Sequence, residues 1–125
     1  SLRDSDFLNA DSQRIENLLQ SVYFDTNQAS IAATERPKID EASDYMKGNP
    51  KDRLLVEGYC DWRGTREYNL ALGDRRANAV KQRLIDLGVD PARVQTLSQG
   101  DLKAEENATP ETMKQDRRAG LVVIR

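Results

Sequence analysis

A carboxylate and a guanidinium stand out in the sequence because each falls where a folded chain could use it to hold a ligand. Asp61 comes directly after a predicted strand, and open α/β sheets tend to bind ligands at the carboxyl ends of their strands. Arg76 lies in a long predicted helix, where it shares a stripe with Leu72, Val80 and Leu84 at four-residue spacing. The pattern therefore predicts a charged side chain in line with core residues.

Asp25 and Asn69 are the polar side chains that we expect close to this pair. Asp25 follows an earlier predicted strand, and Asn69 lies near the start of the helix that carries Arg76. If the two strands are parallel neighbours, the loops that follow them lie at one end of the sheet. A carboxylate, a guanidinium and an amide together fit a zwitterion, because a carboxylate holds an ammonium and a guanidinium holds a carboxylate through two hydrogen bonds.

Each charged residue also has a structural alternative, which residue statistics alone favour. Arg76 could extend to the surface or pair with a structural carboxylate, and Asp61 could cap a turn. Gly73 lies beside Arg76 inside the helix, at a cost of roughly 1 kcal/mol relative to alanine. This glycine suggests that something approaches the helix closely there. Cys60 is expected to be a small buried hydrophobe, because the chain has no histidine to activate its thiol.

Composition argues against several other kinds of site. The 125 residues fit one compact domain, and a net charge of -2 with a pI near 5.2 argues against a nucleic-acid surface. The absence of histidine removes the Ser-His-Asp and Cys-His arrangements and the usual zinc sites, and a single cysteine excludes an internal disulfide. A hydrolase built on paired carboxylates ranks last. We therefore expect no enzyme, no cofactor and no metal site.

The helices and strands predicted along the chain must position these side chains. Together they indicate a two-layer α/β (α+β) sandwich, in which two long helices cover a mixed sheet of about four strands. Residues 1–20 are expected to form a linker with a short helix that begins at Asp11 or Ser12, and residues 21–125 a single domain. Predicted strands cover Val22 to Phe24, Leu54 to Gly58, Val94 to Ser98 and Leu121 to Ile124; predicted helices cover Ala33 to Lys47 and Glu67 to Leu87, with a helical turn at Pro110 to Asp116.

Three segments carry a family resemblance. They are Val22-Tyr23-Phe24-Asp25-Thr26-Asn27, Val56-Glu57-Gly58-Tyr59-Cys60-Asp61, and the run from Arg63 through Tyr68-Asn69-Leu70-Ala71-Leu72-Gly73-Asp74-Arg75-Arg76-Ala77. With the ending Asp116-Arg117-Arg118-Ala119, they resemble the OmpA-like peptidoglycan-binding domain, and the run from Gly64 to Val80 is most similar to its peptidoglycan-associated lipoprotein (Pal) branch. The resemblance covers about Ser21 to Arg125.

This resemblance implies noncovalent binding of peptidoglycan through the diaminopimelate of the stem peptide, without catalysis. By position, Asp61 would hold the ammonium of diaminopimelate and Arg76 its carboxylate, while Asp25, Asn69 and Arg118 would line the pocket. It also implies a periplasmic protein attached to the outer membrane through an anchor that precedes the given sequence. The alternative is a periplasmic interaction domain that docks Tol-system proteins and binds peptidoglycan weakly or not at all.

Two positions depart from the family pattern. Tyr59-Cys60 stands where the family usually has His-Thr, and Asp116 stands where asparagine is usual. The first change is expected to alter packing under the loop that carries Asp61. The second adds a negative charge beside Arg117 and Arg118.

Overall fold

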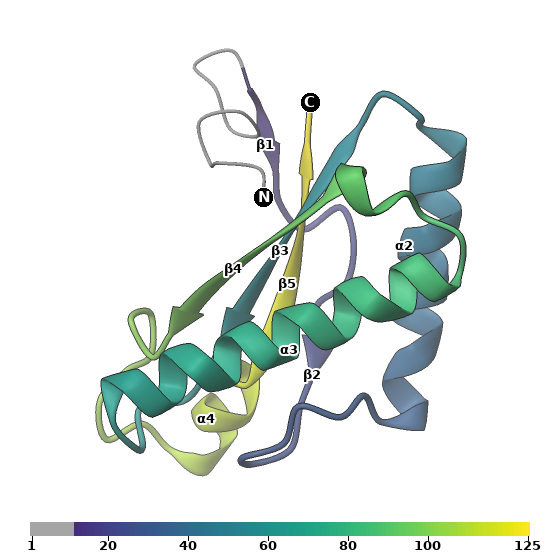
Figure 1. Cartoon of the computed structure of the whole chain (residues 1–125). Coiled ribbons are helices and arrows are strands. Elements are labelled where there is room, and N and C mark those ends of the chain that lie inside the picture. The colour runs from purple at the N-terminus through teal and green to yellow at the C-terminus, as the bar shows by residue number, and fades with distance from the viewer. Residues whose placement is uncertain (1–11) are drawn as a thin grey trace.

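Five strands form one mixed sheet in the computed structural model, which describes residues 12–125 (Figure 1). The strands are β1 (Arg14–Ile15), β2 (Val22–Tyr23), β3 (Arg53–Tyr59), β4 (Val94–Gly100) and β5 (Arg118–Ile124). β3 pairs with β4 in parallel and with β5 in antiparallel register. β1 and β2 both pair with the other edge of β5, also antiparallel.

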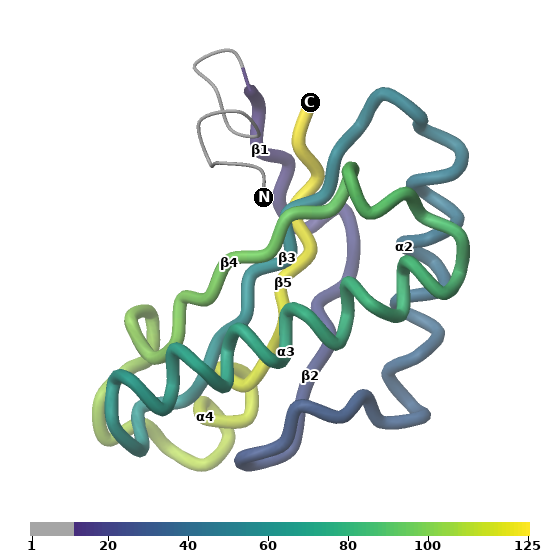
Figure 2. The backbone as a smooth tube through the Cα atoms, viewed as in Figure 1, coloured from purple at the N-terminus to yellow at the C-terminus, as the bar shows by residue number. Residues whose placement is uncertain are grey.

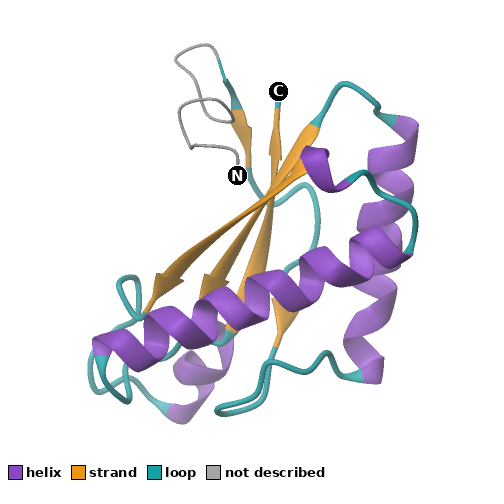
Figure 3. Cartoon of the chain, in the orientation of Figure 1, coloured by secondary structure: helices purple, strands orange, loops and turns teal. Residues whose placement is uncertain are grey.

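Two long helices cover one face of this sheet (Figure 3). They are α2 (Arg36–Gly48), preceded by the 3-10 turn η1 (Ala33–Glu35), and α3 (Arg66–Asp86), followed by η2 (Pro91–Arg93); a shorter helix, α4 (Pro110–Asp116), precedes β5. Thr65 caps α3 by accepting a hydrogen bond from the backbone N–H of Tyr68. None of the helices within residues 12–125 combines the length and the apolar character that a membrane span requires.

The main core lies between the two helices and the sheet. Alternate residues of β5 face this core, and so do the inward stripes of both helices. Its buried members include Ile39, Met46, Leu54, Val56, Val80, Leu84, Ala119, Leu121 and Val123. The intervening residues Leu55, Val122 and Ile124 form a second cluster on the opposite face of the sheet. The predicted two-layer α/β architecture is therefore confirmed, with one more strand than expected.

The beginning of the described chain differs from the sequence prediction. The expected short helix with Ile15, Leu18 and Leu19 is absent from residues 12–20, and Arg14–Ile15 instead pairs with β5. Two backbone hydrogen bonds between Gln13 and Arg125 extend this pairing, and Asn17 adopts a left-handed φ of 63°, which interrupts a helix. The expected linker at residues 1–10 lies outside the described residues.

β2 and β3 run in the same direction, because each is antiparallel to β5. They are not neighbours, since β5 lies between them, but their carboxyl ends still reach the same end of the sheet (Figure 2). The start of α3 returns to this end after the loop that follows β3. The tertiary fold thus brings the loops after β2 and β3 to the first turns of α3.

Two glycines fix how closely α3 lies on the sheet. A Cβ atom at Gly73 would overlap the Ser98 hydroxyl and press on the Gly58 backbone, and one at Gly58 would overlap the Gly73 carbonyl. The close approach predicted at Gly73 is therefore real, and the approaching groups are the backbone of β3 and the Ser98 hydroxyl of β4.

Candidate functional site

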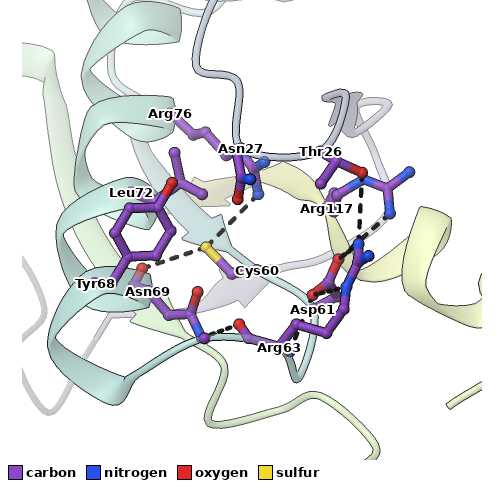
Figure 4. Close-up of a pocket in the computed structure, with 11 residues that line it drawn as sticks. Thr26, Asn27, Cys60, Asp61, Arg63, Tyr68, Asn69, Leu72, Arg76 and Arg117 are labelled. Atoms are coloured by element: carbon purple, nitrogen blue, oxygen red, sulfur yellow. Dashed lines mark hydrogen bonds and ion pairs between the residues drawn. The ribbon is translucent and has the colours of Figure 1, made fainter. Parts of the chain in front are cut away.

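A cavity of about 330 Å³ opens where the loops after β2 and β3, the first turns of α3 and the residue before β5 meet (Figure 4). It is lined by polar and charged side chains with a few apolar ones: Thr26, Asn27, Cys60, Asp61, Arg63, Gly64, Tyr68, Asn69, Leu72, Arg76 and Arg117. Three of the five sequence-predicted site residues, Asp61, Asn69 and Arg76, therefore lie around one cavity.

Asp61 is a buried carboxylate held by two arginines. Only 7% of the residue is exposed. The Arg63 guanidinium donates to both carboxylate oxygens, at 2.8 and 3.2 Å, and the Arg63 backbone N–H donates at 3.1 Å. Arg117 Nη1 lies 3.3 Å from Oδ2. Because Arg63 itself is 44% exposed, it can move aside for a ligand more easily than Arg117.

These partners keep Asp61 ionised. Burial alone would raise its pKa, but the hydrogen bonds and charge of Arg63, together with the hydrogen bond from Arg117, outweigh burial and hold the pKa of the carboxyl below its ordinary value. A ligand ammonium that enters the cavity therefore meets a charged carboxylate at neutral pH.

Arg76 is the largest fully buried side chain of residues 12–125. Its Nε donates to the Gln28 carbonyl at 2.8 Å, Nη1 to the Tyr59 carbonyl at 2.9 Å, and Nη2 to the Asp25 carbonyl at 3.0 Å. Nη1 also lies 3.6 Å from Cys60 Sγ. Arg76 thus neither extends to the surface nor forms an ion pair within the described residues. Its structural role is a different one from the two expected, because it joins three backbone carbonyls.

One N–H of Arg76 Nη2 keeps no protein partner among the described residues, since the other four N–H groups of the guanidinium are directed at the three carbonyls and the thiol. Burial lowers the pKa of Arg76, and Arg117 lowers it further, whereas Cys60 and Asp61 act in the opposite direction. A ligand carboxylate at this N–H would supply the opposing charge that the buried guanidinium lacks.

Asn69 and Cys60 hold the walls of the cavity in place. Asn69 Nδ2 donates to the Arg63 carbonyl at 2.8 Å, which fixes the loop that presents Arg63. Cys60 is a free, buried cysteine whose Sγ lies 3.3 Å from the Asn69 carbonyl, and burial raises the pKa of its thiol. Cys60 is therefore the buried packing residue that we expected.

Asp25 and Arg118, the other two predicted site residues, do not line this cavity. Asp25 contributes its backbone carbonyl to Arg76, and its side chain borders an adjoining cavity. Arg118 lies over the ring of Tyr59, 4.0 Å from its centroid, beside the cluster on the opposite face of the sheet.

Arg117 lies in the cavity where Arg118 was expected, and strand alternation explains the exchange. Residues 119, 121 and 123 of β5 face the helices, so residue 117 continues that row while residue 118 points to the other face. The same alternation of Ala119, Leu121 and Val123 is visible in the sequence and could have identified Arg117. Arg63 and Tyr68 were also missed as lining residues. The conformation of the loop after β3 positions Arg63, and the direction in which α3 begins positions Tyr68.

Asp116, the second departure from the family pattern, is poorly accommodated. Its buried Oδ2 has no hydrogen-bond partner in the described chain. Burial raises the pKa of Asp116, as do the charges of Asp61 and Glu105, while Arg118 and Arg117 oppose the shift.

Within residues 12–125, no group of three or more His, Cys, Asp or Glu side chains is placed to hold a metal ion.

An open mixed sheet with two helices on one face and a charged cavity at the strand ends is the fold of OmpA-like domains, as the comparison with a solved structure shows. The sequence model of the OmpA family matches residues 23–119, and the chain belongs to this family. A crystal structure of the peptidoglycan-associated lipoprotein from Burkholderia pseudomallei superposes with a TM-score of 0.79 at 38% identity, covering 83% of this chain and 89% of that one. The C-terminal domain of Helicobacter pylori MotB shares the fold at 20% identity, with a TM-score of 0.76 over 84% of each chain.

Curated relatives carry the same description. The peptidoglycan-associated lipoprotein of Rhizobium meliloti (strain 1021) is 40% identical over 87 residues, which cover 70% of this chain and 49% of the relative. That of Haemophilus influenzae is 42% identical over 89 residues, covering 71% of this chain and 58% of the relative. The chain thus spans about half the length of the curated relatives that it matches.

Proposed function

We propose that this chain binds peptidoglycan noncovalently, through the diaminopimelate of the stem peptide, and performs no catalysis. The names of the relatives support peptidoglycan as the partner. The observation that carries the diaminopimelate assignment is the pair of opposite charges in one cavity, namely the ionised carboxylate of Asp61 and the buried guanidinium of Arg76 with one N–H to offer.

In this proposal, the ammonium of diaminopimelate binds Asp61 and the carboxylate on the same carbon binds Arg76. The ammonium replaces part of the contact between Arg63 and Asp61, because Arg63 is the more exposed of the two arginines on that carboxylate. Arg76 offers one N–H rather than the two-pronged contact expected from the sequence. Leu72 and Tyr68 then contact the aliphatic part of the ligand along the helix side of the cavity.

The remaining predicted residues take indirect parts. Asn69 positions Arg63, and Asp25 holds Arg76 by its backbone carbonyl. Arg118 lies over Tyr59 and is expected to have no ligand contact. We further propose that the parent protein resides in the periplasm and is attached to the outer membrane.

The test is binding of the purified protein to peptidoglycan sacculi and, by calorimetry, to the stem tripeptide L-Ala-γ-D-Glu-meso-diaminopimelate. Asp61→Asn keeps the side-chain shape but removes the charge that holds the ammonium, and such a loss weakens binding about 30-fold or more. The matched control is Asp74→Asn, an exposed acid on α3, which should bind as the parent does. Equal affinities of the parent and Asp61→Asn for the tripeptide would refute the assignment.

A protein partner of the Tol type remains the second candidate, and one observation favours it. Tyr68 lines the cavity mouth and is 41% exposed, and exposed aromatic residues are enriched at protein interfaces. If the parent protein binds neither sacculi nor tripeptide but captures a purified Tol-system periplasmic protein, and Tyr68→Ala abolishes that capture, the interaction domain is the correct interpretation.

A further inference from the structure

The cavity carries more positive charge than a zwitterionic ligand can balance. Three arginines, Arg63, Arg76 and Arg117, line it together with a single carboxylate, Asp61, so its formal charge is +2, although the whole chain carries -2. One ammonium and one carboxylate bring no net charge. A ligand that binds here is favoured if it brings at least one further negative charge.

Arg117 lines the cavity beside Asp61 and has a guanidinium nitrogen without a hydrogen-bond partner in the described residues. Its side chain is 11% exposed and is fixed by Nε, which donates to the Phe24 carbonyl at 3.0 Å. Nη1 contacts Asp61, but Nη2 has no hydrogen-bond partner among residues 12–125. A guanidinium held in place with an unused N–H edge is suited to a second carboxylate.

Arg117 also lies where the ligand must extend. Besides the main cavity, it lines two adjoining ones, formed by residues 23–35 with Lys114 and Gln115. Asp25 also lines both of these adjoining cavities. A peptide whose zwitterionic end occupies the main cavity therefore passes Arg117 when it leaves towards the loop after β2.

We propose that Arg117 binds a second carboxylate of the stem peptide, beyond the one on the zwitterionic carbon, and that it makes the domain discriminate against stems in which that carboxylate is amidated. This inference rests on the proposed binding of diaminopimelate. The tripeptide has two carboxylates that could serve, the C-terminal one of diaminopimelate and the α-carboxylate of its glutamate. Both offer the same chemistry, and the test distinguishes them.

The test uses three peptides and three proteins in calorimetric titrations. The peptides are the free tripeptide and its two mono-amides, one at each carboxylate. The proteins are the parent, Arg117→Gln and Arg118→Gln; both variants lose one positive charge from neighbouring positions, but only Arg117 lines the cavity. For the parent, one of the two amides should bind about tenfold more weakly than the free acid, the scale of one charge-assisted hydrogen bond.

Arg117→Gln should bind the free tripeptide about as weakly as the parent binds the discriminated mono-amide. Amidation of the tripeptide should change the affinity of Arg117→Gln for it by less than twofold. Arg118→Gln should discriminate as the parent does. The inference is overturned if the parent binds all three peptides equally, or if Arg117→Gln keeps the tenfold discrimination. The first comparison needs only the parent protein, so it holds even if Arg117→Gln fails to fold. If the parent binds all three peptides equally, only this inference is refuted and the proposed function still stands. If the parent binds none of the peptides, both the proposed function and this inference are refuted.

Discussion

A single residue, Arg76, links the binding site to the stability of the protein. Its guanidinium satisfies carbonyls from the loop after β2 and from the end of β3, with no water-exposed surface. Removing it therefore removes both the proposed ligand contact and the support of two loops. Loss of binding on its deletion would not by itself identify a ligand contact.

Arg76→Ala should lower the free energy of unfolding by about 3 kcal/mol or more, because it removes the donor of three part-buried carbonyls and opens a cavity. Arg75→Ala, which removes the exposed neighbouring arginine, should change it by less than about 0.5 kcal/mol. Urea denaturation followed by circular dichroism measures both. Equal stability of the two variants would show that the carbonyl contacts contribute little.

Asp61 should stabilise the fold at neutral pH but not in acid. Its pKa lies below the ordinary value in the folded state, so its contribution is present above the unfolded pKa and is lost as the pH falls through the folded pKa. Asp61→Asn should therefore be less stable than the parent at pH 7, and the difference should shrink towards pH 3. Urea denaturation at the two pH values tests this, and a difference that is constant with pH would contradict it.

Asp116 should show the opposite dependence. Its pKa is raised in the folded state, so its ionised form opposes folding at pH values above the folded pKa. Asp116→Asn, which restores the residue usual in the family, should stabilise the protein by about 1 kcal/mol at pH 7 and by less at pH 3. Thermal unfolding at both pH values is the measurement, and a destabilised variant at pH 7 would refute the reasoning.

At the scale of elements, the contact of α3 with β3 and β4 positions the cavity. α3 carries Asn69, Leu72 and Arg76 along one wall, and the residues just after β3 carry Asp61 and Cys60 opposite. Gly58 and Gly73 allow helix and strand backbones to touch between these walls. The width of the cavity thus depends on two positions that have no side chain.

Gly73→Ala should destabilise the protein by about 1–3 kcal/mol, because the new methyl group overlaps Ser98 and the Gly58 backbone. In an exposed helix interior, the same substitution would stabilise by up to about 1 kcal/mol. Gly48→Ala at the end of α2 is the control, since nothing lies within 4 Å of its added methyl group, and it should be neutral or stabilising. If thermal unfolding ranks the two variants in the reverse order, α3 does not pack as closely as described.

At the scale of the whole molecule, the hydrophobic patterns of the long elements predicted the architecture. Two hydrophobic patterns of the sequence are buried in the structure as predicted. They are the apolar run of β5 and the helical stripe of Leu72, Arg76, Val80 and Leu84. β1 was missed because two residues carry no usable periodicity, and its pairing with β5 depends on chain ends far apart in sequence. The partners of Asp61 and Arg76 were beyond prediction because they are set by loop backbone, whose conformation no residue pattern encodes.

We expected the domain to begin at residue 21, yet β1 and the buried Leu19 precede that point. We propose that residues 21–125 hold the complete binding site. A chain that starts at Ser21 should therefore bind the tripeptide within about twofold of the parent. Its free energy of unfolding should be at least about 1 kcal/mol lower, because the burial of Leu19 and the β1 pairing are lost. Calorimetry and urea denaturation separate the two effects, and loss of binding by a folded fragment would contradict the proposal.

The hydrogen bonds of Arg76 also determine when the site comes into existence during folding. They join residues that are 51, 48 and 17 positions apart in the chain, so the loop-closure entropy of the central fold is already lost when the guanidinium finds its carbonyls. A partly folded chain therefore lacks the proposed site, so the proposed ligand would bind only molecules in which the fold is complete. Free tripeptide at 100 times its dissociation constant would then stabilise the entire fold by about 2.7 kcal/mol, and its presence would slow amide hydrogen exchange throughout the core rather than only around the cavity.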